Sequence, residues 1–239
     1  MDEQPVSGRR VAFFGGSFDP PHLGHLAVAR AARAALGLDT VLFAPVGAQP
    51  LKPKGSTASF GDRVAMTELA IAADAGFRVS LADAPKPTGE PNYTLETLLE
   101  LQKELPAGSA LFCLMGADSF AGLKRWHRGA EIPFAAQLVV ASRPGERLDD
   151  LRSDLPKGLA IEAAAGAEVS ASGVELRSYL LHNPHGQTTP FYVLAGLEVE
   201  ISASEIREQA GEILGTRGAG RELLPEAVSE YIRAHGLYR

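Results

Sequence analysis

A short apolar run near the start of the chain leads directly into a glycine turn, and an alanine-rich segment follows. The run covers 11–14, and the turn continues as Gly-Gly-Ser-Phe-Asp-Pro-Pro-His-Leu-Gly-His over 15–25. This order predicts a strand, a tight turn and the beginning of a helix. Backbone N–H groups without partners and the positive end of the helix dipole favour phosphate at such a junction. The feature predicts an α/β fold with an anion site after its first strand.

The residues of this turn have separate expected roles. Gly15 and Gly16 permit a close approach of a ligand to the backbone, which a Cβ atom would block. His22 and His25 are three positions apart, so their imidazoles share one helix face. Two imidazole donors beside a phosphate cradle suit a polyphosphate whose leaving group must be stabilised. The spacing differs from the dinucleotide fingerprint and the P-loop, and the alternative is a glycine turn with two surface histidines.

Apolar runs alternate with helical patterns along the chain. This alternation predicts a Rossmann-like, doubly wound and mostly parallel sheet. The predicted strands are Arg10–Phe14, Thr40–Ala44, Phe77–Ser80, Ala110–Met115 and Leu138–Ala141. The predicted helices are Leu26–Leu36, Asp62–Ala73 with Asp62 as N-cap, Leu95–Leu105 and Pro225–His235. Because ligands bind at the carboxyl ends of such strands, the segments of interest are Gly15–Pro20, Pro45–Lys54, Gly116–Ser119 and Ser142–Gly145.

The pattern becomes less regular between 148 and 196. That stretch holds an alanine-rich patch, Ala163–Ala167, and a turn-rich segment, His182–Gly186. We interpret it as an insertion or an elaborated strand–loop segment. The expected organisation is a single domain over 1–239 with this segment at about 148–196 and a helical part at about 202–239.

Composition limits the class of protein. The 239 residues are 45% hydrophobic and 22% charged, which suits a soluble globular protein with a sizeable core. A net charge of −6 argues against a general nucleic-acid binder. No stretch has the length of a membrane helix and no signal-peptide pattern precedes the first strand, so we expect a cytoplasmic protein. The single cysteine, Cys113, is expected in the core, and metal-like spacing is absent from four histidines expected at the surface: His127, His182, His185 and His235.

A second motif, Ile-Ser-Ala-Ser-Glu-Ile-Arg, occupies 201–207. Serines at a strand-to-helix junction cap N–H groups or donate to phosphate. Arg207 lies one turn beyond Ser204, so its guanidinium can reach the same anion. Taken alone, the motif is also typical of a capped helix.

The two motifs together resemble those of the nucleotidyltransferase superfamily, α/β proteins with an H-x-G-H and an I-S-S-T-x-I-R-like motif. Within it, the chain is most similar to bacterial nicotinate-nucleotide adenylyltransferases. Supporting segments in the family's order are 92–94 (Asn-Tyr-Thr), 116–119 (Gly-Ala-Asp-Ser), 126–127 (Trp-His), 142–145 (Ser-Arg-Pro-Gly) and 224–238. The resemblance covers most of 10–145 and 197–238.

The loop after the second predicted strand departs from that family. The family's P-x-N-x-P-P-H-[KR] pattern is here Pro-Val-Gly-Ala-Gln-Pro-Leu-Lys over 45–52, without the asparagine. Pro-Val-Gly followed by lysines looks instead like the eukaryotic nicotinamide/nicotinate mononucleotide enzymes.

The resemblance implies transfer of AMP from ATP to nicotinate mononucleotide, which forms deamido-NAD and pyrophosphate. It implies catalytic roles for His22, His25 and Arg207. The implied ATP-binding residues are Gly15, Gly16, Ser17, Phe18, His22, His25, Ser204, Ile206 and Arg207. Mg²⁺ would bridge ATP oxygens, so no metal site made of protein side chains is expected.

Six residues are the implied mononucleotide ligands: Lys52, Tyr93, Thr94, Asp118, Trp126 and Arg143. Trp126 offers its ring face to a pyridinium, or it is a half-buried packing residue. Asp118 can accept from ribose hydroxyls or cap a helix, and Thr94 can contact the pyridine substituent or begin a helix. Lys52 can bind phosphate or remain a solvated charge.

Other functions remain open at this point. They are a dual or nicotinamide-mononucleotide enzyme, a pantetheine-phosphate adenylyltransferase of the same superfamily, and a nucleotide-binding regulatory module without catalysis. ATP and the mononucleotide are the expected partners, with no nucleic acid and no membrane. The oligomeric state is left open, a homo-oligomer included.

Overall fold

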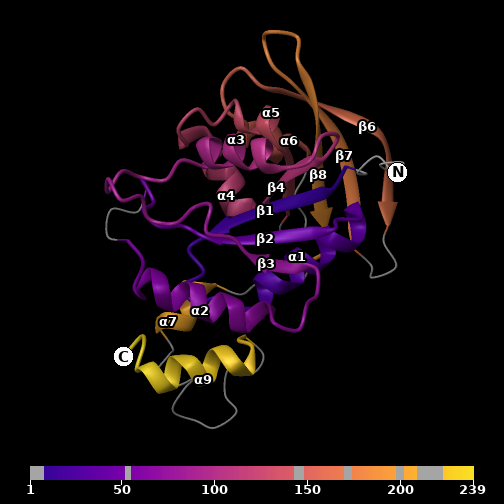
Figure 1. The fold of residues 1–239 in the computed structure, drawn as a ribbon. Coiled ribbons are helices and arrows are strands. Elements are labelled where there is room, and N and C mark those ends of the chain that lie inside the picture. Colours follow the sequence, from indigo (N-terminus) through magenta and orange to yellow (C-terminus); the bar gives the residue numbers. More distant parts are fainter. Residues whose placement is uncertain (1–7, 52–54, 143–147, 170–173, 198–201, 209–222) are drawn as a thin grey trace, which may run out of the picture. The chain divides into compact units, whose positions relative to one another are not determined.

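The computed structural model describes residues 8–51, 55–142, 148–169, 174–197, 202–208 and 223–239 (Figure 1). Its eight strands form one sheet in the order β3-β2-β1-β4-β5-β8-β7-β6. β1 pairs with β4, β4 with β5, and β5 with β8, all in parallel. Only β6–β7 and β7–β8 are antiparallel among the ladders described here. The α/β fold with a mostly parallel sheet is confirmed.

The described elements follow the predicted order closely as far as β5. The strands are β1 (Arg10–Gly16), β2 (Thr40–Pro45), β3 (Phe77–Val79), β4 (Ala110–Gly116) and β5 (Gln137–Ala141). The helical segments are α1 (Leu23–Leu36), α2 (Phe60–Ile71), α3 (Thr94–Glu104), α4 (Ala117–Gly122), η1 (Leu123–Arg125) and α5 (Ile132–Ala135).

The chain divides into two compact units. The first comprises 1–14, 31–41 and 93–198, and the second 15–30, 42–92 and 199–239. The expectation of a single domain with an elaborated segment stays a prediction.

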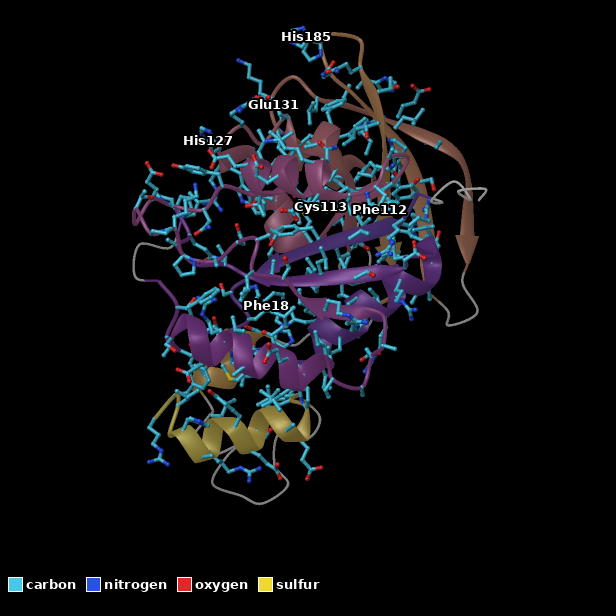
Figure 2. The ribbon with its side chains drawn as sticks, viewed as in Figure 1. Phe18, Phe112, Cys113, His127, Glu131 and His185 are labelled. Carbon is cyan, nitrogen blue, oxygen red and sulfur yellow. The ribbon has the colours of Figure 1, made fainter. Side chains whose placement is uncertain are left out.

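The first unit has a core built on β4 and β5. Residues 111–115 of β4 are all buried, as expected for an apolar strand that is covered on both faces. Cys113 is buried there, as predicted, and Figure 2 labels it beside Phe112. α3 adds Leu95, Leu98 and Leu101, whose spacing places them on one helix face.

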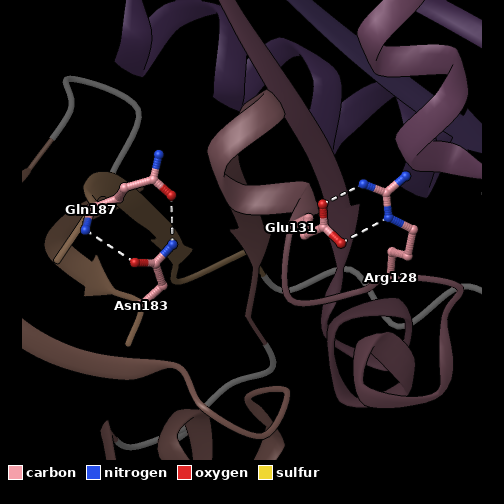
Figure 3. Close-up of polar contacts among 4 residues, drawn as sticks. All are labelled: Arg128, Glu131, Asn183 and Gln187. Atoms are coloured by element: carbon pink, nitrogen blue, oxygen red, sulfur yellow. Dashed lines mark hydrogen bonds and ion pairs between the residues drawn. The ribbon is translucent and has the colours of Figure 1, made fainter. Parts of the chain in front are cut away.

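The stretch between 148 and 196, expected as an insertion or an elaborated strand–loop segment, is more regular than its sequence pattern indicated. The structure has α6 (Leu148–Asp154) followed by three long strands, β6 (Ala160–Val169), β7 (Glu175–His182) and β8 (Thr188–Ala195). The alanine-rich patch forms part of β6, and the turn-rich segment joins β7 to β8. At that turn, Asn183 Oδ1 accepts from the N–H groups of His185 and Gln187, both at 3.0 Å. Its Nδ2 donates to Gln187 Oε1 (Figure 3).

The second unit contains α2 and α9 (Glu226–His235), which lie side by side (Figure 1). Ser59, not Asp62, is the N-cap of α2, because its Oγ accepts from the Asp62 N–H at 3.1 Å. The Asp62 carboxylate accepts in return from Ser59 Oγ and from the Tyr231 hydroxyl of α9. α7 (Ala203–Glu208) belongs to the same unit. In the part of the chain that the structure describes, no helix is long and apolar enough to cross a membrane.

Candidate active site

The turn after β1 is held in an unusual backbone conformation. Phe18 has a φ of 46°, which is uncommon for a residue with a bulky side chain, and it is only 1% exposed. Its ring lies against Gly16, where an added Cβ atom would come within 3.2 Å of the ring. The ring also contacts that of Phe43 on β2, with centroids 5.6 Å apart. A side chain at position 16 would therefore press on the buried Phe18 ring within the turn itself.

The two motif histidines meet at the beginning of α1, as predicted. Their ring centroids lie 3.6 Å apart, and the backbone N–H of His22 donates to His25 Nδ1 at 3.1 Å. The His25 ring also contacts the Phe18 ring in an edge-to-face arrangement, with centroids 4.9 Å apart. Because Nδ1 of His25 accepts a hydrogen bond, its neutral ring carries the proton on Nε2. His25 can therefore donate a hydrogen bond without carrying a charge.

Burial makes both imidazoles poor bases. It lowers the pKa of His22 from 6.5 to about 4. The pKa of His25 is lowered well below its ordinary value by burial, and further by a positive charge on His22. Both rings are neutral at pH 7 in the absence of an anion, so each can donate one hydrogen bond from its protonated nitrogen.

The second motif forms α7, and its arginine reaches the first motif. Arg207 Nη2 donates to Ser204 Oγ at 3.0 Å, as the one-turn spacing predicts. Its Nη1 donates to the backbone carbonyl of Asp19 at 2.7 Å. Ser202 Oγ accepts from the Ser204 N–H, and Ile206 is buried, whereas Ile201 lies outside the described residues. The structure thus joins two motifs that are separated by more than 180 residues of sequence.

A buried arginine that the sequence reasoning missed supports the same turn. Arg63 is 2% exposed, and it donates to the backbone carbonyls of Ser17 at 2.7 Å and of Val46 at 2.8 Å. Burial lowers its pKa, against the opposing effect of the Asp19 charge. The available signal was its position on the apolar face of α2, in line with Met66 and Ala70.

Asp19 is the second residue that was missed as a site component. It is 3% exposed, and its carboxylate accepts three hydrogen bonds. The donors are the Thr57 N–H at 2.6 Å, the Ala58 N–H at 3.0 Å and the Tyr238 hydroxyl at 2.7 Å. Asp19 therefore connects the turn to the segment before α2 and to the segment after α9.

Four of the predicted mononucleotide ligands are described. Tyr93 is the N-cap residue of α3 and Thr94 is its first residue, so Thr94 does begin that helix. Trp126 is half-buried at the end of η1, and Asp118 is exposed in the first turn of α4. Lys52 and Arg143 lie outside the described residues.

His127, expected as a surface residue, is exposed but has an aromatic partner. Its ring lies 4.4 Å from that of Tyr93, centroid to centroid. The segment that carries Trp126 and His127 is fixed by Arg128, whose guanidinium forms two hydrogen bonds with the Glu131 carboxylate (Figure 3). The Gly129 N–H donates to the Trp126 carbonyl at 3.1 Å, which closes a turn around this pair.

The residues assigned to the two substrates belong to different units. All those assigned to ATP lie in 15–30 and 199–239, within the second unit. The four described residues assigned to the mononucleotide lie in 93–198, within the first.

The side chains expected to bind ATP suit an anion more than a bare metal ion. They are neutral imidazoles, serine hydroxyls and a guanidinium. Among the described ranges, no group of three or more His, Cys, Asp or Glu side chains could hold a metal ion.

Comparison with known proteins identifies the class first. A family model described as cytidylyltransferase-like matches residues 13–209. Two solved structures of Plasmodium falciparum nicotinic acid mononucleotide adenylyltransferase, complexed with NaAD and with APC, have the same fold. Their TM-scores are 0.64 and 0.63 at 16% and 15% identity, with 96% of this chain and 97% of theirs covered. The fold and the family match define a nucleotidyltransferase enzyme.

Closer relatives identify the family. A probable nicotinate-nucleotide adenylyltransferase of Gloeobacter violaceus is 38% identical over 231 residues, 97% of each chain. One of Aeromonas hydrophila is 38% identical over 230 residues, 96% of this chain and 97% of that one. One of Trichlorobacter lovleyi is 35% identical over 230 residues, 96% of this chain and 99% of that one. The chain belongs to the nicotinate-nucleotide adenylyltransferase family.

Proposed function

We propose that this enzyme transfers the adenylyl group of ATP to nicotinate mononucleotide, forming deamido-NAD and pyrophosphate in NAD biosynthesis. The observation that carries the proposal is the bond from Arg207 to the Asp19 carbonyl, which brings the two nucleotidyltransferase motifs together. It is supported by family membership over nearly the whole chain.

The reaction needs positioning and charge stabilisation more than covalent chemistry. A phosphate oxygen of the mononucleotide forms a bond to the α-phosphorus of ATP. The bond from that phosphorus to the oxygen bridging it to the β-phosphorus breaks, and this oxygen leaves with pyrophosphate. No protein nucleophile takes part.

The first motif is proposed to bind the ATP phosphates. Gly15, Gly16 and Ser17 present the backbone at the end of β1, and Phe18 packs beneath them. His25 donates from Nε2 to an oxygen on which negative charge grows during the reaction. His22 orients that ring through the hydrogen bond from its backbone N–H to His25 Nδ1, and it supplies a second imidazole.

The second motif is proposed to complete the same site. The Arg207 guanidinium has five N–H donors, of which the bonds to Ser204 and Asp19 use two. The remaining donors suit the β- and γ-phosphates, together with Ser204 at the beginning of α7. Ile206 supports this helix from its buried face.

We propose Mg²⁺ as the divalent cation of the reaction. It would be held by ATP oxygens and water, since the described donors include no acidic cluster. Bound there, it would neutralise charge on the phosphates. The protein residues would hold and orient the phosphates around it.

The mononucleotide is assigned to Tyr93, Thr94, Asp118 and Trp126, with Lys52 and Arg143. The nicotinate carboxylate fits the beginning of α3, where N–H groups and the helix dipole favour an anion. Trp126 presents an aromatic face to the pyridinium ring. A nicotinamide group would need an acceptor for its NH₂ in place of a donor to a carboxylate.

The test compares kcat/KM for nicotinate and nicotinamide mononucleotide with ATP, by pyrophosphate release. We expect the higher value for nicotinate mononucleotide. Equal values, or a preference for the amide, would show that the changed loop at 45–52 has altered the substrate. Phosphopantetheine serves as a further acceptor, because release with it alone would favour the pantetheine-phosphate reaction. No release with any acceptor would favour a regulatory nucleotide-binding module. A cytoplasmic location and the absence of nucleic-acid partners stay predictions.

A further inference from the structure

Tyr238 makes a partly buried hydrogen bond to the turn at the end of β1 (residues 15–20, the phosphate turn of the proposed site) from the other end of the sequence. Its hydroxyl donates to Asp19 Oδ1 at 2.7 Å, across 219 positions of sequence. Burial raises its pKa, as do the hydrogen bond to Asp19 and the negative charge of that carboxylate. The hydroxyl therefore stays protonated and remains a donor at all working pH values.

The backbone after α9 adopts a conformation that places the Tyr238 side chain against Asp19. Gly236 has a φ of 61°, and the Leu237 N–H donates to the Ile232 carbonyl at 3.1 Å, which ends the helix with a reversal. Tyr238 then adopts a φ of 61° itself. A left-handed conformation is unfavourable for a tyrosine, so contacts of its side chain must maintain it. The bond to Asp19 is such a contact.

Asp19 connects Tyr238 to the groups assigned to ATP through hydrogen bonds. Its carbonyl accepts from Arg207 Nη1, while its carboxylate accepts from Tyr238 and from two backbone N–H groups before α2. Phe18, directly before it, is the residue with the left-handed conformation in the turn. A shift of Asp19 therefore displaces both the Arg207 guanidinium and the turn.

We propose that Tyr238 is a positioning residue for ATP, which acts through Asp19 to hold the phosphate turn and Arg207 in one arrangement. Tyr238 needs no contact with the substrate for this role. The inference rests on the proposed function, because it assigns the turn to ATP. It adds a residue outside both motifs to the machinery of the reaction.

The test is Tyr238→Phe, which keeps the ring and removes the hydroxyl. Tyr231→Phe is the matched control, since it removes a tyrosine hydroxyl that donates at 3.0 Å to another aspartate of the same unit, Asp62, outside the site. We expect kcat/KM for ATP to fall roughly tenfold in Tyr238→Phe, because a hydrogen bond to a charged group is lost. The KM for the mononucleotide should remain within about twofold, and the control should match the wild type.

A double variant tests the route through Asp19. If Tyr238 acts on Arg207, Tyr238→Phe should have a smaller effect in an Arg207→Lys background than in the wild type. Fully additive effects would overturn the proposed route. An unchanged kcat/KM for ATP with a lowered melting temperature would show that Tyr238 is only structural and would overturn the proposal.

Direct calorimetric titration with ATP separates this inference from the proposed function. Weaker ATP binding in Tyr238→Phe, with Tyr231→Phe unchanged, supports the positioning role whichever acceptor the enzyme uses. Failure of the wild type to transfer adenylate to any mononucleotide would overturn the proposed function and leave the binding comparison to stand. Equal ATP affinity in all three proteins would overturn the positioning role alone.

Discussion

Replacement of the Asp19 carboxylate by an amide tests the most heavily bonded acidic group of the candidate site. Oδ1 accepts from the Ala58 N–H and the Tyr238 hydroxyl, and Oδ2 accepts from the Thr57 N–H at 2.6 Å. In Asp19→Asn, the NH₂ group must occupy one of these two oxygen positions. In either orientation it faces a backbone N–H, so a buried donor confronts another donor.

The expected cost follows from these bonds. One buried donor left without an acceptor costs about 1–3 kcal/mol. The bonds that remain lose their charge assistance, which adds roughly 1 kcal/mol. We therefore expect the free energy of unfolding to fall by about 3 kcal/mol in Asp19→Asn.

Urea denaturation, followed by tryptophan fluorescence and circular dichroism, measures this change. Asp62→Asn is the control, because Asp62 also accepts from a tyrosine hydroxyl but is only partly buried at the beginning of α2. We expect the control to lose less than about 1 kcal/mol. Equal losses in the two variants, or a loss below about 1 kcal/mol in Asp19→Asn, would refute the argument from buried donors.

Three further predictions concern the motif residues. His25→Ala should lower kcat by roughly 10²–10³ with an unchanged circular dichroism spectrum, because a transition-state donor is lost; near-normal turnover would contradict this role. Arg207→Lys should lower ATP affinity or kcat, because an ammonium lacks the planar fork of donors, and equal activity would reduce the second motif to a capped helix. The His22 pKa of about 4 places fewer protons on the native than on the unfolded chain between pH 6.5 and 4. This histidine should therefore reduce the free energy of unfolding by about 2 kcal/mol from pH 7 to pH 5. Urea denaturation of the wild type and His22→Gln should show the difference, and identical pH profiles would refute it.

Local patterns in the sequence predicted most of the parallel sheet. β4 is a continuous apolar run, and such a run is typical of a strand covered on both faces in a parallel sheet. The same reasoning misplaced the N-cap of α2, because Ser59 and Asp62 stand in the spacing of a capping box and only the serine precedes the helix.

The strands β6 to β8 could not be predicted from local patterns. Alanine-rich sequence favours a helix by propensity, whereas β6 is held in an extended form by its ladder with β7. That ladder changes register between Ala163 and Ala167, so the alternation that would mark a strand is interrupted. The extended conformation of this region therefore depends on its pairing with neighbouring strands and not on its local sequence.

The candidate site was predicted where its residues are close in sequence and missed where they are not. The histidine pair and the Ser204–Arg207 contact follow from helical spacing. Arg63 reaches Ser17 across 46 positions and Tyr238 reaches Asp19 across 219, so no local spacing could reveal either bond. Their functional assignment remains a prediction, as does that of the mononucleotide residues.

The neutral state of the two histidines bears on the kinetics of ATP capture. Uncharged donors produce no long-range field, so they cannot draw a polyanion from a distance. The chain as a whole has a formal charge of −6, which opposes the approach of ATP at low ionic strength. In the proposed site, the imidazoles would act only after contact, where they would slow the departure of ATP together with Arg207. The histidine pair would therefore lengthen the residence time of the nucleotide, while attraction from a distance would depend on charged groups such as Arg207.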